Sequence, residues 1–162
     1  MGSGFSLTGA PFGSVTLAQC RDEQIRFRRD RGLNRTYDPR VPYLVRMTQL
    51  SQSVTLEFDN DVALIRIDNP PVNALSHHVR QGLLDGMTQA ENSDATAIVV
   101  ICEGRTFIAG ADITEFSGPP KPPSLQEAQD AMENCSKPVI AAVHGTALGG
   151  GLEVALCAHY RV

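Results

Sequence analysis

Alternating hydrophobic and polar positions predict a β-hairpin in the segment that begins at Ser53. Every second side chain is apolar over residues 54–58, and a second apolar run follows at residues 62–67. Alternation of this kind is typical of strands that bury one face. Asp59-Asn60-Asp61 lies between the two runs and supplies turn-forming residues, so the two strands should pair as a hairpin. Asn69-Pro70-Pro71 then ends the second strand and opens a loop.

Helical and strand patterns alternate along the rest of the chain. Ser76 can cap a helix that extends to about Glu91, with the apolar residues Val79, Leu83, Met87 and Ala90 on one face. The other predicted elements are strands at 97–101 and 139–143 and helices at 124–134 and 152–158. Both strands are continuous apolar runs, so we expect them to be covered on both faces. This order of elements predicts the α/β class.

The composition of the chain changes near Met47. Residues 1–46 contain eight Arg, no Lys and four acidic residues, whereas residues 47–162 contain six basic and fourteen acidic residues. The first segment shows little periodicity, and we expect a basic extension that is either a solvated charge run, a nucleic-acid patch or not native sequence. Residues 47–162 would then form the folded domain, and Met47 could be its true start.

Composition excludes several classes of protein. Hydrophobic residues make up 42% and charged residues 20% of the 162 residues, which is ordinary for a globular domain, and the net charge of −4 gives no reason to expect a nucleic-acid partner. No apolar run approaches the ~20 residues of a membrane span, and the N-terminus lacks a signal peptide. The four cysteines have no metal-ligand spacing, so we expect reduced thiols, no metal site and a cytoplasmic protein.

Two loops rich in small residues follow the two predicted buried strands. They cover residues 107–112, within a predicted loop at 105–116, and residues 144–153. Loops at the carboxyl ends of strands are where open α/β folds bind ligands, and small residues let a ligand oxygen approach backbone N–H groups. A helix that starts at the second loop would direct free N–H groups to the same place. One N–H from each loop could therefore form an oxyanion hole.

Glu153 is the candidate acid/base group. It lies three residues after Gly150, so on the first turn of a helix the two residues share a face. The carboxylate would then lie beside an oxygen held by the Gly150 N–H, as acid/base chemistry next to a carbonyl requires. The alternatives are that the glycine-rich turn serves only packing and that Glu153 only complements the helix dipole. His77, His78 and His144 are interpreted as structural or exposed.

Three motifs follow one another in the second half of the chain, at residues 109–113, 137–145 and 147–153. Together they resemble the crotonase (enoyl-CoA hydratase/isomerase) superfamily, and the resemblance covers about residues 54–162. Residues 69–75 and 157–161 further resemble the amino-terminal hydratase part of bifunctional enoyl-CoA hydratase/3-hydroxyacyl-CoA dehydrogenases. The implied fold is the amino-terminal portion of a crotonase ββα spiral.

The resemblance also implies roles for particular residues. The oxyanion donors would be the N–H groups of Ala111 and Gly150, and Glu153 would be the first of two catalytic glutamates. Arg105 stands where family members often carry a basic residue near the CoA phosphates, a role that suits its charge and fork geometry. The remaining residues expected to contact the CoA thioester are Ala109, Gly110, Asp112, Ile113 and Gly149.

The implied reaction is syn hydration of a 2-trans-enoyl-CoA in fatty acid β-oxidation. It needs no cofactor beyond the CoA of the substrate, and NAD would be used only if a dehydrogenase part follows. The family's second glutamate would lie beyond Val162, so we expect a truncated sequence. The whole protein would be a homo-oligomer or a fusion to dehydrogenase domains. The alternatives are a Δ3,Δ2-enoyl-CoA isomerase and an inactive acyl-CoA-binding or oligomerisation fragment.

Overall fold

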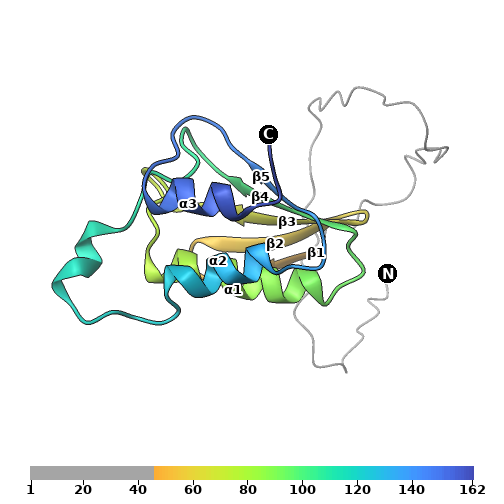
Figure 1. Ribbon diagram of the computed structural model, residues 1–162, viewed down its shortest axis with the longest axis horizontal. Helices are drawn as coiled ribbons and strands as arrows, with labels where there is room; N and C mark the ends of the chain where they lie inside the picture. The colour runs from red at the N-terminus through yellow and green to blue at the C-terminus, as the bar shows by residue number, and fades with distance from the viewer. Residues whose placement is uncertain (1–45) are drawn as a thin grey trace, which may run out of the picture. The chain divides into compact units, whose positions relative to one another are not determined.

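The computed structural model describes residues 46–162, which fold around one six-stranded sheet (Figure 1). The strands follow one another across the sheet in chain order. They are β1 (Arg46–Gln49), β2 (Val54–Asp59), β3 (Val62–Ile67), β4 (Ala97–Cys102), β5 (Val139–Ala142) and β6 (Tyr160–Arg161). The predictions made for the basic extension fall, apart from Arg46, outside the described residues.

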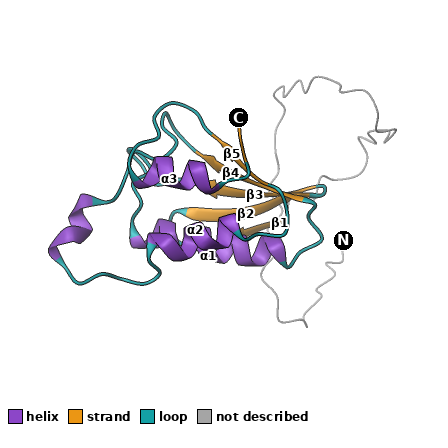
Figure 2. Cartoon of the chain, viewed as in Figure 1, coloured by secondary structure: helices purple, strands orange, loops and turns teal. Residues whose placement is uncertain are grey.

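Strand direction changes once within the sheet. β1, β2 and β3 are antiparallel, and β2–β3 is the predicted hairpin, with Leu56 opposite Ile65. β3, β4, β5 and β6 are parallel, so the chain must cross over between them. The crossovers contain the helices α1 (His77–Glu91), α2 (Leu125–Glu133) and α3 (Gly150–Cys157) and the short 3₁₀ helix η1 (Ile113–Ser117) (Figure 2). The α/β class is therefore confirmed.

The core lies between the sheet and α1. Val79, Leu83, Met87 and Ala90 are fully buried, as the helical spacing predicts, and α1 packs against β2, β3 and β4. Along β4 the buried side chains alternate with half-buried ones. The expectation that the apolar strands are covered on both faces is therefore wrong for the described residues, because only one face is fully buried.

Three elements differ from the sequence prediction. β1 was not predicted, because its side chains at residues 47–49 are exposed and carry no apolar alternation. η1 lies in the segment predicted to be a loop, where Asp112 accepts a hydrogen bond from the N–H of Thr114 and caps the turn. α3 begins at Gly150 and not at Leu152, because Gly149 acts as its N-cap. β6 continues the parallel part of the sheet beside β5.

The helix N-termini have different caps. Ser124 accepts a hydrogen bond from the N–H of Glu127, whose carboxylate accepts in return from the N–H of Ser124. This reciprocal capping box fixes the start of α2. Ser76 stands at the predicted N-cap of α1, but its side chain makes no capping hydrogen bond. Within residues 46–162 no helix has the length and apolar character needed to cross a membrane.

Candidate functional site

The two loops of small residues lie against each other. The N–H of Leu148 donates to the carbonyl oxygen of Ile108 at 3.1 Å. A Cβ atom at Gly151 would lie 2.1 Å from that same oxygen, and a Cβ at Gly145 would lie 2.1 Å from the carbonyl oxygen of Arg105. Both distances are far below van der Waals contact, so only glycine allows this approach. The loop after β4 and the loop after β5 therefore form one packed unit.

The peptide unit between Gly110 and Ala111 has a fixed direction. The carbonyl oxygen of Gly110 accepts a hydrogen bond from the N–H of Leu75 at 2.8 Å, and Leu75 forms a parallel bridge with Ala111. In a trans peptide the carbonyl and the following N–H point in opposite directions. The N–H of Ala111 therefore points away from the backbone of Leu75, and no acceptor within residues 46–162 contacts it.

The same reasoning orients the N–H of Gly150. The carbonyl oxygen of Gly149 accepts hydrogen bonds from the N–H groups of Leu152 and Glu153, each at 3.0 Å. That carbonyl therefore points along α3, and the N–H of Gly150 points out of the helix at its amino end. No hydrogen-bond acceptor in the described part of the chain contacts it either.

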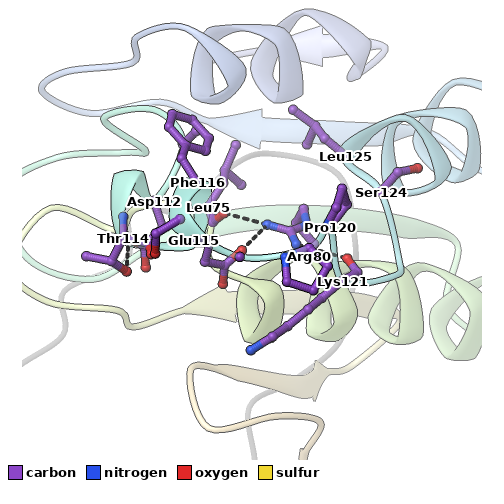
Figure 3. A pocket seen from close by; sticks show the side chains of 14 residues that line it. Leu75, Arg80, Asp112, Thr114, Glu115, Phe116, Pro120, Lys121, Ser124 and Leu125 are labelled. Atoms are coloured by element: carbon purple, nitrogen blue, oxygen red, sulfur yellow. Dashed lines mark hydrogen bonds and ion pairs between the residues drawn. The ribbon is translucent and has the colours of Figure 1, made fainter.

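A hollow of about 890 Å³ lies beside these loops (Figure 3). Ala111 and Leu75 line it, together with Leu125 from α2. A Cβ at Gly150 would lie 2.8 Å from the Leu75 side chain and 2.9 Å from the Leu125 side chain, so the first residue of α3 borders two of the lining residues. The rest of the wall is Arg80 from α1, Ser124 at the start of α2 and most of the segment from Asp112 to Lys121, which contains η1.

Glu153 lies in the first turn of α3 and is exposed. Its Oε2 accepts a hydrogen bond of 3.1 Å from Nε2 of Gln129, a buried residue of α2. Gln129 was missed in the sequence because an amide in a helix with an otherwise ordinary pattern gives no signal. The alternative role for Glu153, as a partner of the helix dipole, also fits its position in the first turn.

The other residues that the family resemblance predicts lie at separate places in the loop after β4 and in η1. Arg105 is exposed in the loop after β4, next to Gly145, and Ile113 is 76% exposed at the start of η1. The Asp112 carboxylate accepts hydrogen bonds from the hydroxyl and the N–H of Thr114, which lower its pKa. The immediate role of Asp112 is thus to cap η1. Ala109 and Gly110 lie with Ala111 in the loop that packs against the glycine-rich turn.

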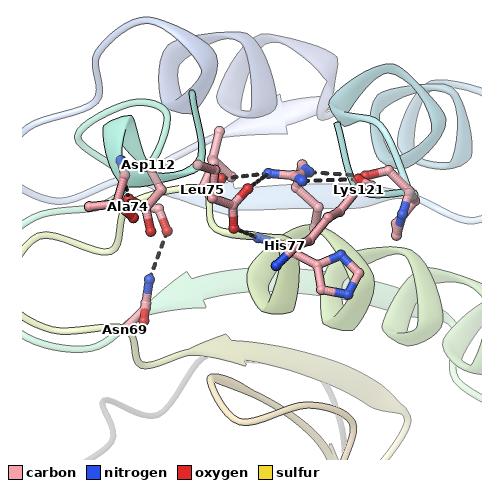
Figure 4. A network of polar contacts seen from close by, with 10 residues as sticks. Asn69, Ala74, Leu75, His77, Asp112 and Lys121 are labelled. Atoms are coloured by element: carbon pink, nitrogen blue, oxygen red, sulfur yellow. Dashed lines mark hydrogen bonds and ion pairs between the residues drawn. The ribbon is translucent and has the colours of Figure 1, made fainter. Parts of the chain in front are cut away.

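An ion pair that was not predicted ties η1 to α1 (Figure 4). Arg80 pairs with Glu115 at 3.0 Å and also donates to the carbonyl oxygens of Leu75, Lys121 and Pro123. Burial acts to raise the pKa of Glu115, but hydrogen bonds from the His77 N–H and from Arg80 outweigh it and leave that pKa below its ordinary value. Arg80 therefore holds the proline-rich wall of the hollow in place.

Asn73 connects the loop after β3 to the loop after β4. It is 3% exposed, and its amide nitrogen donates to the carbonyl oxygens of Glu103 and Thr106 at 2.8 and 2.9 Å. Its amide oxygen accepts from the N–H of Asn69 at 2.8 Å, so every polar atom of the side chain has a partner. The Asn73 backbone has a φ of 52°, which asparagine tolerates better than most residues.

The cysteines and histidines give little sign of chemistry. Burial raises the pKa of Cys102 and of Cys157 to about 12, so both thiols stay protonated at neutral pH and are poor nucleophiles. His144 contacts the carbonyl oxygen of Gly104 at 3.2 Å, which fits a structural role. In the described segment no group of three His, Cys, Asp or Glu residues could hold a metal ion.

The site thus offers two free backbone N–H groups and a nearby carboxylate, which is a set suited to stabilising a carbonyl oxygen that gains negative charge.

Known proteins carry the same sequence patterns. The family model described as enoyl-CoA hydratase/isomerase matches residues 57–162. A peroxisomal bifunctional enzyme of Danio rerio is 51% identical over 102 residues, which cover 62% of this chain and 14% of that protein.

Two further relatives agree with this match. A Bacillus subtilis (strain 168) protein named "Probable enoyl-CoA hydratase" is 41% identical over 118 residues, which cover 68% of this chain and 46% of that protein. The crystal structure of an enoyl-CoA hydratase/carnithine racemase from Magnetospirillum magneticum has a TM-score of 0.64 and 26% identity, over 71% of this chain and 46% of that chain. This chain therefore spans half or less of each relative's length. The matched residues contain both loops and all of α3, and by them the chain belongs to the enoyl-CoA hydratase/isomerase family.

Proposed function

We propose that these residues form the thioester-binding half of an active site that hydrates 2-trans-enoyl-CoA. The N–H groups of Ala111 and Gly150 hold the thioester oxygen, and Glu153 orients and activates the water. One observation carries the proposal. The carbonyl oxygens of Gly110 and Gly149 already accept backbone hydrogen bonds, so the N–H groups that follow them, those of Ala111 and Gly150, point away from those bonds. In this proposal the acyl group lies in the adjoining hollow, against Leu75, which borders both donors, and Leu125, which borders Gly150.

The proposed reaction adds water to one face of the double bond. The water oxygen bonds to C3 while Glu153 accepts its proton, and the π electrons move onto the thioester oxygen as an enolate. The two N–H groups stabilise that oxygen, and a second acid delivers a proton to C2. By the family resemblance this acid is a glutamate outside residues 1–162. Arg105 contacts the CoA phosphates, and the loop residues Ala109, Gly110, Asp112, Ile113 and Gly149 shape the thioester pocket.

The presence of Glu153 favours hydration over the isomerase reaction, which relies mainly on the other carboxylate. The name of the Danio rerio relative, a peroxisomal bifunctional enzyme, supports a bifunctional protein and a peroxisomal location in place of the cytoplasmic one expected from the sequence. By the family resemblance, the second part is a dehydrogenase that uses NAD. Fractionation of the native cells, followed by detection with an antibody, tests the location. Cross-linking tests whether the whole protein is an oligomer.

The activity is tested with protein expressed from the whole gene. Crotonyl-CoA should lose its conjugated-enoyl absorbance as it is hydrated, whereas a 3-enoyl-CoA, which reports isomerase activity, should gain that absorbance more slowly. Acetoacetyl-CoA provides a separate probe of the oxyanion hole, because its bound enolate absorbs in the near ultraviolet. Protein that neither hydrates crotonyl-CoA nor binds acetoacetyl-CoA as the enolate would refute the proposal.

A further inference from the structure

Gln129 is a buried amide whose hydrogen bond goes to the candidate catalytic carboxylate. Its side chain belongs to α2 and the residue is 7% exposed. A buried amide is costly unless it is hydrogen-bonded. Nε2 of Gln129 donates to Oε2 of Glu153 at 3.1 Å, and because an ionised carboxylate only accepts hydrogen bonds, the amide nitrogen is the atom that faces it.

α2 packs against α3, and two of its side chains lie against the first turn of that helix. Leu125 lies one turn before Gln129 on α2, and its side chain would be 2.9 Å from a Cβ at Gly150. Glu153 lies one turn after Gly150 on α3. Residues one turn apart share a helix face, so one face of α2 meets both members of the candidate site on α3. The capping box at Ser124 fixes the helix that provides these contacts.

The two carboxylate oxygens of Glu153 differ in their hydrogen bonding. Oε2 is held by Gln129, whereas within residues 46–162 no donor contacts Oε1. We propose that Gln129 is a positioning residue for water addition: it fixes the rotamer of Glu153 so that Oε1 meets the attacking water. This inference rests on the proposed hydratase function and adds to it a residue that neither the motifs nor the resemblance indicates.

The variant Gln129→Met tests the inference, because methionine has a similar shape but no N–H donor. In the protein expressed from the whole gene, we expect kcat for crotonyl-CoA to fall by about tenfold to a hundredfold, because a small misplacement of a catalytic group can cost up to about a hundredfold in rate. KM should stay within about twofold, since the thioester contacts are untouched. The matched control is Gln126→Met on the same helix, where the amide contacts only the exposed Asp130, and its kcat should stay at the wild-type value.

A double-mutant cycle separates positioning from packing. If Gln129 acts through Glu153, adding Gln129→Met to Glu153→Gln should not lower the residual rate further. Gln129→Leu is the second variant, should the methionine variant fold poorly by circular dichroism. A wild-type kcat in Gln129→Met, or an equal loss in the Glu153→Gln background, would overturn the inference alone. Wild-type protein with no hydratase activity would overturn the proposed function and the inference together.

Discussion

Replacing Gly150 by proline would remove one of the two proposed oxyanion donors while leaving the helix intact. Gly150 is the first residue of α3, and proline is favoured at that position because its missing N–H has no partner inside the helix. A single oxyanion donor is worth about a hundredfold to a thousandfold in kcat, or about 2.7–4 kcal/mol. We therefore expect Gly150→Pro to lower kcat for crotonyl-CoA by at least about a hundredfold.

Gly150→Ala is the matched control, because it adds a Cβ but keeps the N–H. That Cβ would lie 2.8 Å from Cδ1 of Leu75 and 2.9 Å from Cδ2 of Leu125, both of which are ends of flexible side chains. Alanine and proline share this crowding, so its effect on stability and on the acyl pocket appears in both variants. The difference in kcat between them then reports the replacement of the N–H by the proline ring.

Both variants should be assayed for crotonyl-CoA hydration and for the near-ultraviolet absorbance of bound acetoacetyl-CoA enolate. The alanine variant should retain the enolate signal and the proline variant should lose it. Circular dichroism and melting temperatures show whether both are folded. If folded Gly150→Pro matches Gly150→Ala in kcat and in enolate binding, the reasoning from the Gly149 carbonyl to an oxyanion donor is wrong.

Three further predictions concern the carboxylates and the loop contacts. Glu153→Gln should lower crotonyl-CoA hydration by at least about a hundredfold without changing the melting temperature, and activity within a few-fold of wild type would return Glu153 to the role of dipole partner. Asn73→Gly, which tolerates the positive φ, should lower the free energy of unfolding in urea by about 1–3 kcal/mol, because the part-buried hydrogen bonds to the carbonyls of Glu103 and Thr106 are lost; an unchanged midpoint would contradict this. The lowered pKa of Glu115 means that its ionised form stabilises the fold above the ordinary Glu pKa, and this contribution is lost as the pH falls through the lowered value. Glu115→Gln should therefore weaken the dependence of urea stability on pH in the acid range, and identical slopes for both proteins would refute the assignment.

The parts of the fold that the sequence predicts well are those whose signal is local. The β2–β3 hairpin and the apolar face of α1 each depend on residues within a few positions of one another. β1 escaped prediction because pairing with β2 determines it, and its own side chains are exposed.

The candidate site divides in the same way. The small residues around Gly110 and Gly150 are visible in the sequence, and the predicted helix start accounts for the free N–H of Gly150, but the direction of the Ala111 N–H is not visible. That direction depends on the pairing of the Gly110 carbonyl with Leu75, which lies 35 positions earlier in the numbering of the chain. Gln129 and Arg80 likewise act across long separations, through Glu153 and through carbonyls of the proline-rich segment. The residues near an amide or guanidinium side chain on an amphipathic helix do not indicate such long-range contacts.

The close contacts at Gly145 and Gly151 have a consequence for interpreting sequence variants of this protein. Neither residue has a side chain that could touch a substrate, yet each lies against a carbonyl of the opposite loop with no space for one more carbon atom. A missense change at either position would push the two loops apart and separate the N–H groups of the proposed oxyanion hole. In a mutational scan scored by growth, both positions should therefore be as intolerant as Glu153. A scan that measures activity alone would wrongly count both glycines as catalytic residues. Measuring protein abundance alongside activity would show that their variants disrupt the packing of the loops.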